Sequence, residues 1–296
     1  MNIGIDLGGT WIKAVLINEL GDVKHQLYQP TQDQDLGINN WKKAIAEAVE
    51  TLRQKTDLTI QNIGLSAPGL PNKNNQYIET MPGRLQGLEG FDWSEFLGQK
   101  TFVINDAQAA TMAEYRFGVA KGFQNMVMLT LGTGVGGGVV LNGQLYQGLL
   151  QRAGHLGHIS IDNQGLNDIT NTPGSLEDAI GNATIQQRSL GKYQTTYELL
   201  EDYRKKNTFA TWLWLNSVRK LSIGISSIIN MFSPEVVVLG GGITQADSDL
   251  FDPLNDFLDL YEWRIKQQKI PVLQAQFGDM AGAIGAAGFA QTFGTN

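Results

Sequence analysis

The chain has no cysteine, only three histidines among its 296 residues, and no excess of positive charge. Without cysteine it can form neither a disulfide nor a thiolate metal site. Its formal net charge of −7 and pI near 5.0 argue against a general nucleic-acid or membrane-surface role, because both need basic patches. No run approaches the roughly 18 apolar residues of a membrane span. From these absences we expect a soluble protein without disulfides.

The remaining composition is ordinary for such a protein. Hydrophobic residues make up 42% and charged residues 17%, which argues against disorder, and the length suits about two domains. A glycine-rich loop begins within ten residues of Met1, so we expect no cleaved signal and a cytoplasmic location.

Two segments of the chain share one plan: Met1–Ala14, MNIGIDLGGTWIKA, and Asn125–Val140, NMVMLTLGTGVGGGVV. In each, an apolar strand runs into glycines and a threonine and is followed by a second apolar strand. Backbone N–H groups exposed at such bends bind phosphate oxygens. Either cluster alone is equally explained as a tight turn. Two of them, with Asp6 beside the first, predict two lobes that grip one polyphosphate, which favours a nucleotide-dependent phosphotransferase.

A dinucleotide site is the competing interpretation, because Gly132, Gly134 and Gly137 fit the pattern GxGxxG. That fingerprint needs a helix after the glycines. Here a strand follows and ends at Asn142-Gly143, the signal of a type I′ hairpin. The P-loop ending Gly-Lys-Ser/Thr is also absent. Neither nucleotide fold is therefore favoured.

The hydrophobic pattern predicts two copies of one unit, a three-strand meander followed by a helix and a strand. In the first half we expect strands at Ile3–Asp6, Ile12–Ile17, Val23–Tyr28, Ile63–Ser66 and Thr101–Ile104, helices over about Asn40–Lys55 and from Ala107 to Gly118, and a polar loop after the Pro68-Gly69 turn. In the second half we expect strands at Met126–Leu131, Val139–Leu141, Gln144–Tyr146, Val236–Leu239 and Val272–Gln274, an irregular segment at Gln147–Gly174, and helices over about Phe209–Met231, about Asp252–Leu260 and from Gly282.

This repetition predicts a duplicated α/β fold of two lobes with a cleft between them. The N-terminal lobe would span residues 1–108, joined by the terminal helix at about 282–296, and the C-terminal lobe would span 109–281.

Phosphoryl transfer needs a charge-neutralising clamp, a metal and a group that accepts the proton of the attacking hydroxyl. Asp6, at the carboxyl end of the first strand, is the candidate for holding Mg²⁺ through water, since Mg²⁺ keeps several waters. The candidate ATP contacts are Gly8, Gly9 and Thr10 in the first loop, Gly132, Thr133 and Gly134 in the second, and Gly240, Gly241 and Gly242 for the adenine-ribose group. A simple strand-to-helix turn explains the last three glycines equally well.

Asp106 is the candidate general base, at a strand–helix junction where an aspartate is also a common helix N-cap. The two interpretations are compatible, because capping fixes a carboxylate at a strand end. His155, His158 and Glu177 lie in or beside the irregular segment and are candidates for hydrogen bonds to sugar hydroxyls. A metal pair or surface positions are the alternatives for the two histidines.

Several of these motifs resemble one family. IGIDLGGT, SAPG, INDAQAA, LGTGVGGGVVLNG, AGHLGH, PEVVVLGGGI and AGAIGAA occur from Ile3 to Ala287 in the order of the ROK family (repressors, open reading frames and sugar kinases). The resemblance implies an actin-like (ribonuclease H-like) fold and ATP- and Mg²⁺-dependent phosphorylation of a hexose, usually at O6. It implies that Asp106 is the base, that Asn105 and Gly69 contact the sugar, and that His158 and Glu177 line the same pocket.

The chain departs from the family pattern at two places. The family commonly has Glu where this chain has His155, and an imidazole can donate a hydrogen bond whereas a carboxylate only accepts. The usual zinc motif, a His followed by CxCGxxGCxE, has Asp168, Thr170 and Ser175 in place of its three cysteines. Hydroxyls are poor zinc ligands, so we expect no zinc, with Pro173 and local hydrogen bonds holding the loop.

The sequence therefore predicts a kinase whose partners are a small-molecule sugar and ATP, with no nucleic-acid or membrane partner. The alternative is a sugar-binding regulatory or sensor protein of the same family with weak or no kinase activity. Repressors of the family carry an extra N-terminal helix-turn-helix domain, whereas this chain starts at the first strand. The sequence leaves open which hexose is used, whether polyphosphate replaces ATP, and whether the chain forms a homodimer.

Overall fold

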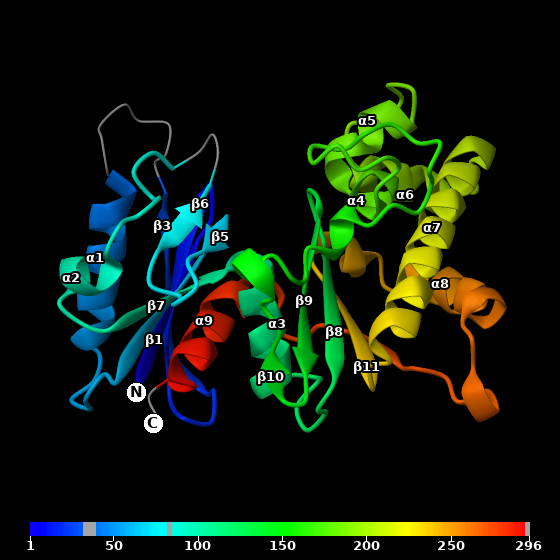
Figure 1. Ribbon diagram of the computed structural model, residues 1–296. Coiled ribbons are helices and arrows are strands. Elements are labelled where there is room, and N and C mark those ends of the chain that lie inside the picture. The colour runs from blue at the N-terminus through cyan, green and yellow to red at the C-terminus, as the bar shows by residue number, and fades with distance from the viewer. Residues whose placement is uncertain (32–39, 82–84, 294–296) are drawn as a thin grey trace. The chain divides into compact units, whose positions relative to one another are not determined.

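The computed structural model describes residues 1–31, 40–81 and 85–293, which form two compact units (Figure 1). The first unit comprises Met1–Gly122, Gln144–Ala153 and Gln276–Asn296, and the second comprises Phe123–Gly143 and Gly154–Ala275. The predicted end of the first lobe at residue 108 falls inside helix α3 (Asp106–Arg116), which lies wholly in the first unit.

The first unit contains β1 (Asn2–Leu7), β2 (Trp11–Ile17), β3 (Val23–Pro30), α1 (Asn40–Arg53), β4 (Asn62–Ala67), β5 (Leu70–Pro71), β6 (Ile78–Thr80), α2 (Trp93–Leu97), β7 (Thr101–Asn105), α3, β10 (Gln144–Leu145) and α9 (Ala281–Gln291). The second contains β8 (Met126–Leu131), β9 (Val135–Leu141), α4 (Leu176–Ile180), α5 (Ile185–Arg188), α6 (Thr196–Arg204), α7 (Thr208–Phe232), β11 (Val236–Gly240), α8 (Ser248–Tyr261) and β12 (Val272–Gln274).

The two five-stranded sheets have the same strand order. The first runs β3-β2-β1-β4-β7 and the second runs β10-β9-β8-β11-β12. In the first sheet, β1 pairs antiparallel with β2 and parallel with β4. In the second, β8 likewise pairs antiparallel with β9 and parallel with β11. Within the described residues, no helix is long and apolar enough to cross a bilayer. The duplicated order confirms the predicted α/β fold class.

The alternation of β1 decides which face of the first sheet each helix covers. Ile3, Ile5 and Leu7 are buried in one hydrophobic core together with residues of α1. Residues of opposite parity face the other side of a strand, and here they are Gly4 and Asp6, which lie against α9. The first sheet is therefore covered on both faces.

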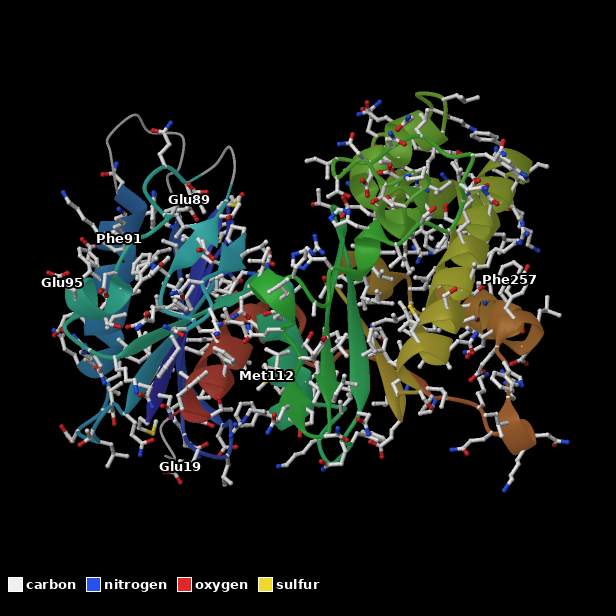
Figure 2. The ribbon with its side chains drawn as sticks, in the orientation of Figure 1. Glu19, Glu89, Phe91, Glu95, Met112 and Phe257 are labelled. Atoms are coloured by element: carbon white, nitrogen blue, oxygen red, sulfur yellow. The ribbon has the colours of Figure 1, made fainter. Side chains whose placement is uncertain are left out.

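Helix α9 packs against this sheet at the distance of backbone contact. A Cβ at Gly4 would lie 1.9 Å from the carbonyl oxygen of Ala283, and a Cβ at Gly64 would lie 1.9 Å from that of Ala286. Figure 1 shows α9 beside α3, and Figure 2 labels Met112 of α3, which packs in one apolar cluster with Phe289 of α9. Glycine and alanine are needed here because any larger side chain would force the elements apart.

Two predictions about the starts of elements need correction. Strand β9 begins at Val135 rather than at Val139, because the glycines 136–138 pair in register with β8. Helix α8 begins at Ser248 rather than near Asp252. The predicted hairpin turn is confirmed, with left-handed φ values of 51° at Asn142 and 79° at Gly143.

The predicted polar loop before β7 also contains structure, namely β5, β6 and α2. The side chain of Asp92 accepts the N–H of Glu95 at 3.0 Å and so caps α2. Trp93 is fully buried, and its ring lies 4.8 Å from that of Phe91, which Figure 2 labels beside Glu95. The buried indole and the cap both stabilise this short helix, which has no long periodic pattern.

Candidate active site

Several of the predicted site residues of each unit lie at the carboxyl ends of its strands. Asp6 and the loop at Gly8 end β1, Gly69 follows β4, and Asn105 ends β7. In the second unit, Gly132 follows β8 and Gly240 ends β11. The carboxyl ends of parallel strands lie at one edge of a sheet, where α/β proteins bind ligands.

Asp6 is the most perturbed carboxylate of this edge. Its Oδ1 accepts a hydrogen bond of 2.8 Å from the hydroxyl of Ser66, the residue that pairs with it on β4. Burial raises the pKa of Asp6 to about 6; the Ser66 hydrogen bond opposes this effect and the charge of Asp106 adds to it. Two carboxylates that repel each other in this way form a donor set that suits a hard cation such as Mg²⁺.

The first turn of α9 reaches the carboxylate of Asp6 because residue 282 is glycine. A Cβ at Gly282 would lie 2.5 Å from Cγ of Asp6, so alanine does not fit there. The amino-terminal end of a helix carries partial positive charge, which favours an anion beside it. Ser66 and Gly282 lie inside the motifs SAPG and AGAIGAA, but sequence reasoning assigned neither a role. A glycine in the first turn of a buried helix was the available signal.

Asp106 is the first residue of α3 and its side chain is exposed. The predicted capping role belongs instead to Asn105, whose Oδ1 accepts the N–H groups of Ala107 at 3.0 Å and Gln108 at 3.3 Å. The Nδ2 of Asn105 donates to the carbonyl oxygen of Gly69 at 3.1 Å. Asn105 therefore ties the Gly69 turn to the start of α3 and fixes the backbone that carries Asp106.

The first glycine loop is braced by the residue that follows β3. Thr31 donates its N–H to the carbonyl oxygen of Thr10 at 2.9 Å and its hydroxyl to that of Gly8 at 2.7 Å. The N–H of Gly8 is used within the turn, donating to Trp11 at 3.0 Å. The side chain of Thr10 is exposed at the end of this rigid turn, next to Gly9.

The second glycine loop is held by the segment that follows α4. The N–H of Asn182 donates to the carbonyl oxygen of Gly132 at 2.9 Å, and that of Ala183 donates to Thr133 at 2.8 Å. A Cβ at Gly132 would meet no atom within 4 Å, so neither packing nor a left-handed φ explains glycine at this position. The described part of the chain therefore gives no packing reason for glycine at this position.

The three glycines that end β11 have different roles. Gly241 has a φ of 88°, and a Cβ there would lie 2.4 Å from the carbonyl oxygen of Leu131. Gly240 is packed against Met128 and Ala275. A tight turn with close packing therefore accounts for Gly240 and Gly241. Gly242, in contrast, has open space around its Cβ position, as Gly132 has.

The two histidines of AGHLGH lie on a turn that packs tightly against β9. A Cβ at Gly157 would lie 2.0 Å from the carbonyl oxygen of Val135, and Gly154 has a φ of 94° beside Gly138. Leu156 between the histidines is buried in the core. The turn therefore holds His155 and His158, both half-buried, at fixed positions on the second unit.

Asp168 organises the loop in which the family has its zinc motif. Its Oδ2 lies 2.8 Å from Nδ1 of His158, and its Oδ1 accepts the N–H and the hydroxyl of Thr170, each at 2.8 Å, and the N–H of Thr172 at 3.0 Å. Burial acts to raise the pKa of Asp168, but these hydrogen bonds outweigh it and hold the pKa well below its usual range. The local hydrogen bonds of this loop thus centre on a carboxylate, and the hydroxyl of Ser160 adds one by donating to the carbonyl oxygen of Pro173 at 2.7 Å.

These residues do not fit a zinc ion. Ser175, in one cysteine position, caps α4 by accepting the N–H of Asp178 at 3.2 Å. The hydroxyl of Thr170, in another, donates to Asp168. Asp168 and His158 already satisfy each other, so no set of free soft ligands is left for the metal.

Replacing Asp6 by Asn should stabilise the protein at neutral pH. Because its folded pKa is raised from 3.8 to about 6, ionised Asp6 destabilises the fold once the pH exceeds that range. We expect the free energy of unfolding of Asp6→Asn to exceed that of the parent by about 1–3 kcal/mol at pH 7.5, with the gain vanishing below pH 3.8. Urea unfolding at several pH values measures this. Asp256→Asn, on the exposed side of α8, is the control and should change little.

Replacing Asp168 by Asn should destabilise the second unit, because a buried charged acceptor of several hydrogen bonds is lost. We expect a loss of about 1–3 kcal/mol at pH 7. The loss should shrink as the pH falls below 3.8, because the stabilisation from ionised Asp168 is full above its unfolded pKa and declines as the pH falls toward its lower folded pKa. Thr170→Val, which removes one donor, should cost less. A strong zinc chelator should leave the unfolding curve of the parent unchanged, and a large shift would contradict the proposed carboxylate-held loop.

Comparison with known proteins places the whole chain in one family. The model of the ROK family matches residues 2–292. A glucokinase of Thermotoga maritima is 29% identical over 96% of this chain and 95% of its own length.

Solved structures agree with this assignment. The crystal structure of a ROK hexokinase from Thermus thermophilus superposes with a TM-score of 0.87 and 30% identity over 98% of each chain. A ROK family glucokinase from Streptomyces griseus, solved in complex with glucose and AMPPNP, shares the fold with a TM-score of 0.79 and 24% identity, over 98% of this chain and 99% of its own. The actin-like fold predicted from the motifs is confirmed, and the chain belongs to the ROK family.

Proposed function

We propose that this protein transfers the γ-phosphate of ATP to a hydroxyl group of a hexose, with O6 of glucose or a related hexose as the acceptor. The observation that carries this proposal is the pair Asp6 and Asp106. Both stand at carboxyl strand ends of one sheet, and the charge of one raises the pKa of the other. One carboxylate suits a metal and the other suits a proton acceptor, which are the two groups that phosphoryl transfer needs.

Asp106 would accept the proton of the attacking hydroxyl. Its side chain is exposed, and its backbone is fixed by the Asn105 cap, so the carboxylate is both accessible and oriented. Asp6 would hold Mg²⁺ through water, and when bound the ion would offset the charge of the phosphates. The first turn of α9 packs against the carboxylate of Asp6 at Gly282 and so fixes its position.

The candidate ligand contacts divide between the two units. For the sugar they are Gly69, Asn105 and Asp106 in the first unit, and His155, His158 and Glu177 in the second. For ATP they are Gly8, Gly9 and Thr10 in the first, and Gly132, Thr133, Gly134, Gly240, Gly241 and Gly242 in the second. The open Cβ positions at Gly132 and Gly242 support the nucleotide assignment, because glycine there has no packing explanation.

The relatives support the same reaction class. The Thermotoga maritima protein is a glucokinase and the Thermus thermophilus protein a hexokinase. The Streptomyces griseus protein holds glucose and an ATP analogue. The proposal needs no zinc, because hydrogen bonds to Asp168 stabilise the loop where the family's zinc motif lies.

The test is ATP consumption with a panel of glucose, fructose, mannose, allose, N-acetylglucosamine and N-acetylmannosamine. At least one sugar should be phosphorylated, and Asp106→Asn should lower kcat for it by about 10²–10⁴-fold while sugar binding persists, because a positioned base contributes that much. Asp256→Asn should retain full activity. A parent protein that binds a sugar but phosphorylates none would favour the regulatory alternative. Normal turnover in a folded Asp106→Asn variant would remove Asp106 from the mechanism.

Replacing His155 by Glu should change the ranking of sugars rather than abolish activity. A site that pairs particular hydroxyls discriminates strongly when one partner is left unpaired, and Glu removes a donor while adding charge. The change should be seen in kcat/KM across the same sugar panel, with little change in KM for ATP. An unchanged ranking with unchanged kcat/KM would place His155 outside the sugar site.

A further inference from the structure

The carboxylate of Glu177 is bonded to the second glycine loop. Glu177 lies in the first turn of α4, and its Oε2 accepts the N–H of Val135 at 2.9 Å. Val135 directly follows Gly134 at the start of β9. A residue proposed to contact the sugar therefore also holds the backbone proposed to contact the nucleotide.

Gly134 leaves room for the carboxylate of Glu177 in this position. A Cβ at residue 134 would lie 2.2 Å from Oε2 of Glu177, and the φ of Gly134 lies outside the left-handed region, so the backbone conformation itself does not demand glycine. Gly132 differs, because its Cβ position is open. Two glycines of one loop thus have separate explanations: Gly134 makes room for Glu177, and Gly132 makes room for a ligand.

The far end of α4 holds the same loop. Gly181 follows α4, and a Cβ there would lie 2.9 Å from the carbonyl oxygen of Thr133. The next two residues donate their N–H groups to the carbonyl oxygens of Gly132 and Thr133. Arg188 fixes this end by donating to the carbonyl oxygen of Gly181 at 2.8 Å and to the hydroxyl of Ser217 at 2.7 Å. Because it is held at both ends, the loop must follow any shift of α4.

We propose that Glu177 couples sugar binding to nucleotide binding within the second unit, an inference that rests on the proposed kinase function. A carboxylate is planar and rigid, so a sugar hydroxyl that donates to it reorients both of its oxygens together. Reorienting Oε2 shifts Val135 and the adjoining loop, and a nucleotide on that loop reorients Glu177 in return. Such coupling is reciprocal, since each ligand must change the affinity of the other by the same factor.

The test compares Gly134→Ala with its matched control Gly132→Ala. Both substitutions lie in the same loop and should weaken AMPPNP binding. Only the first displaces Glu177, so we expect it alone to weaken sugar binding in the absence of nucleotide, by about 10-fold, a coupling of ordinary size. Isothermal titration calorimetry with the sugar that the parent phosphorylates fastest measures this, and thermal unfolding checks that both variants are folded.

A second measurement uses Glu177→Ala, which leaves the loop glycines intact. In the parent, saturating AMPPNP should change the Kd of the sugar by about 5-fold or more. In Glu177→Ala the sugar should bind more weakly, but its Kd should no longer respond to AMPPNP. If Glu177 had only a structural role, saturating AMPPNP would still change the Kd of the sugar in Glu177→Ala.

Equal sugar affinities in folded Gly134→Ala and Gly132→Ala would overturn the coupling, as would a nucleotide-dependent Kd that survives in Glu177→Ala. A parent protein that binds sugar and nucleotide without any mutual effect also overturns it but leaves the proposed function standing. A parent that binds no sugar overturns both.

Discussion

The first unit depends on direct backbone contact between α9 and the elements around it. Gly4 and Gly64 bring β1 and β4 against α9, and a Cβ at Gly285 would lie 1.7 Å from the carbonyl oxygen of Ala109 in α3. At these glycine positions no side chain separates the elements, so direct backbone contacts help to fix the position of α9. Its first turn meets Asp6, and the burial that raises the pKa of Asp6 follows from that position.

The second unit achieves similar rigidity by different means. Its turn of AGHLGH packs against β9 through Gly157, and its second glycine loop is held by hydrogen bonds from the segment after α4. Two charged groups, the buried Asp168 and the half-buried Arg188, anchor the neighbouring loops. Asp168 is kept ionised by its donors, and Arg188 bonds carbonyl oxygens although burial lowers its pKa to about 10. Both stabilise irregular backbone that has no sheet or long helix to hold it.

Much of this architecture could be predicted from the sequence, because each strand of the two meanders has its own apolar pattern. The type I′ turn at Asn142-Gly143 is a local signal and was predicted correctly. The start of β9 was not, because glycines have low strand propensity and only their partners on β8 hold them in the sheet.

The candidate site shows the same limit. The positions of Asp6, Asn105 and Asp106 at strand ends follow from local pattern, but whether Asn105 or Asp106 caps α3 depends on backbone angles that no spacing encodes. The role of Asp168 was missed because, in the sequence, it was interpreted only as the replacement of a zinc-binding cysteine. Only its donors, brought from several loop positions, show it to be a structural centre.

The placement of α9 has a consequence for synthesis. The first unit is discontinuous, since α9 follows the whole second unit in sequence, and until it emerges the face of β1 and β4 that carries Gly4 and Gly64 has no cover. The second unit is complete once Ala275 has been made. Domains generally fold as units, so we expect the first unit to keep this open sheet face until α9 has been made, whereas the second unit does not depend on α9 for its own packing.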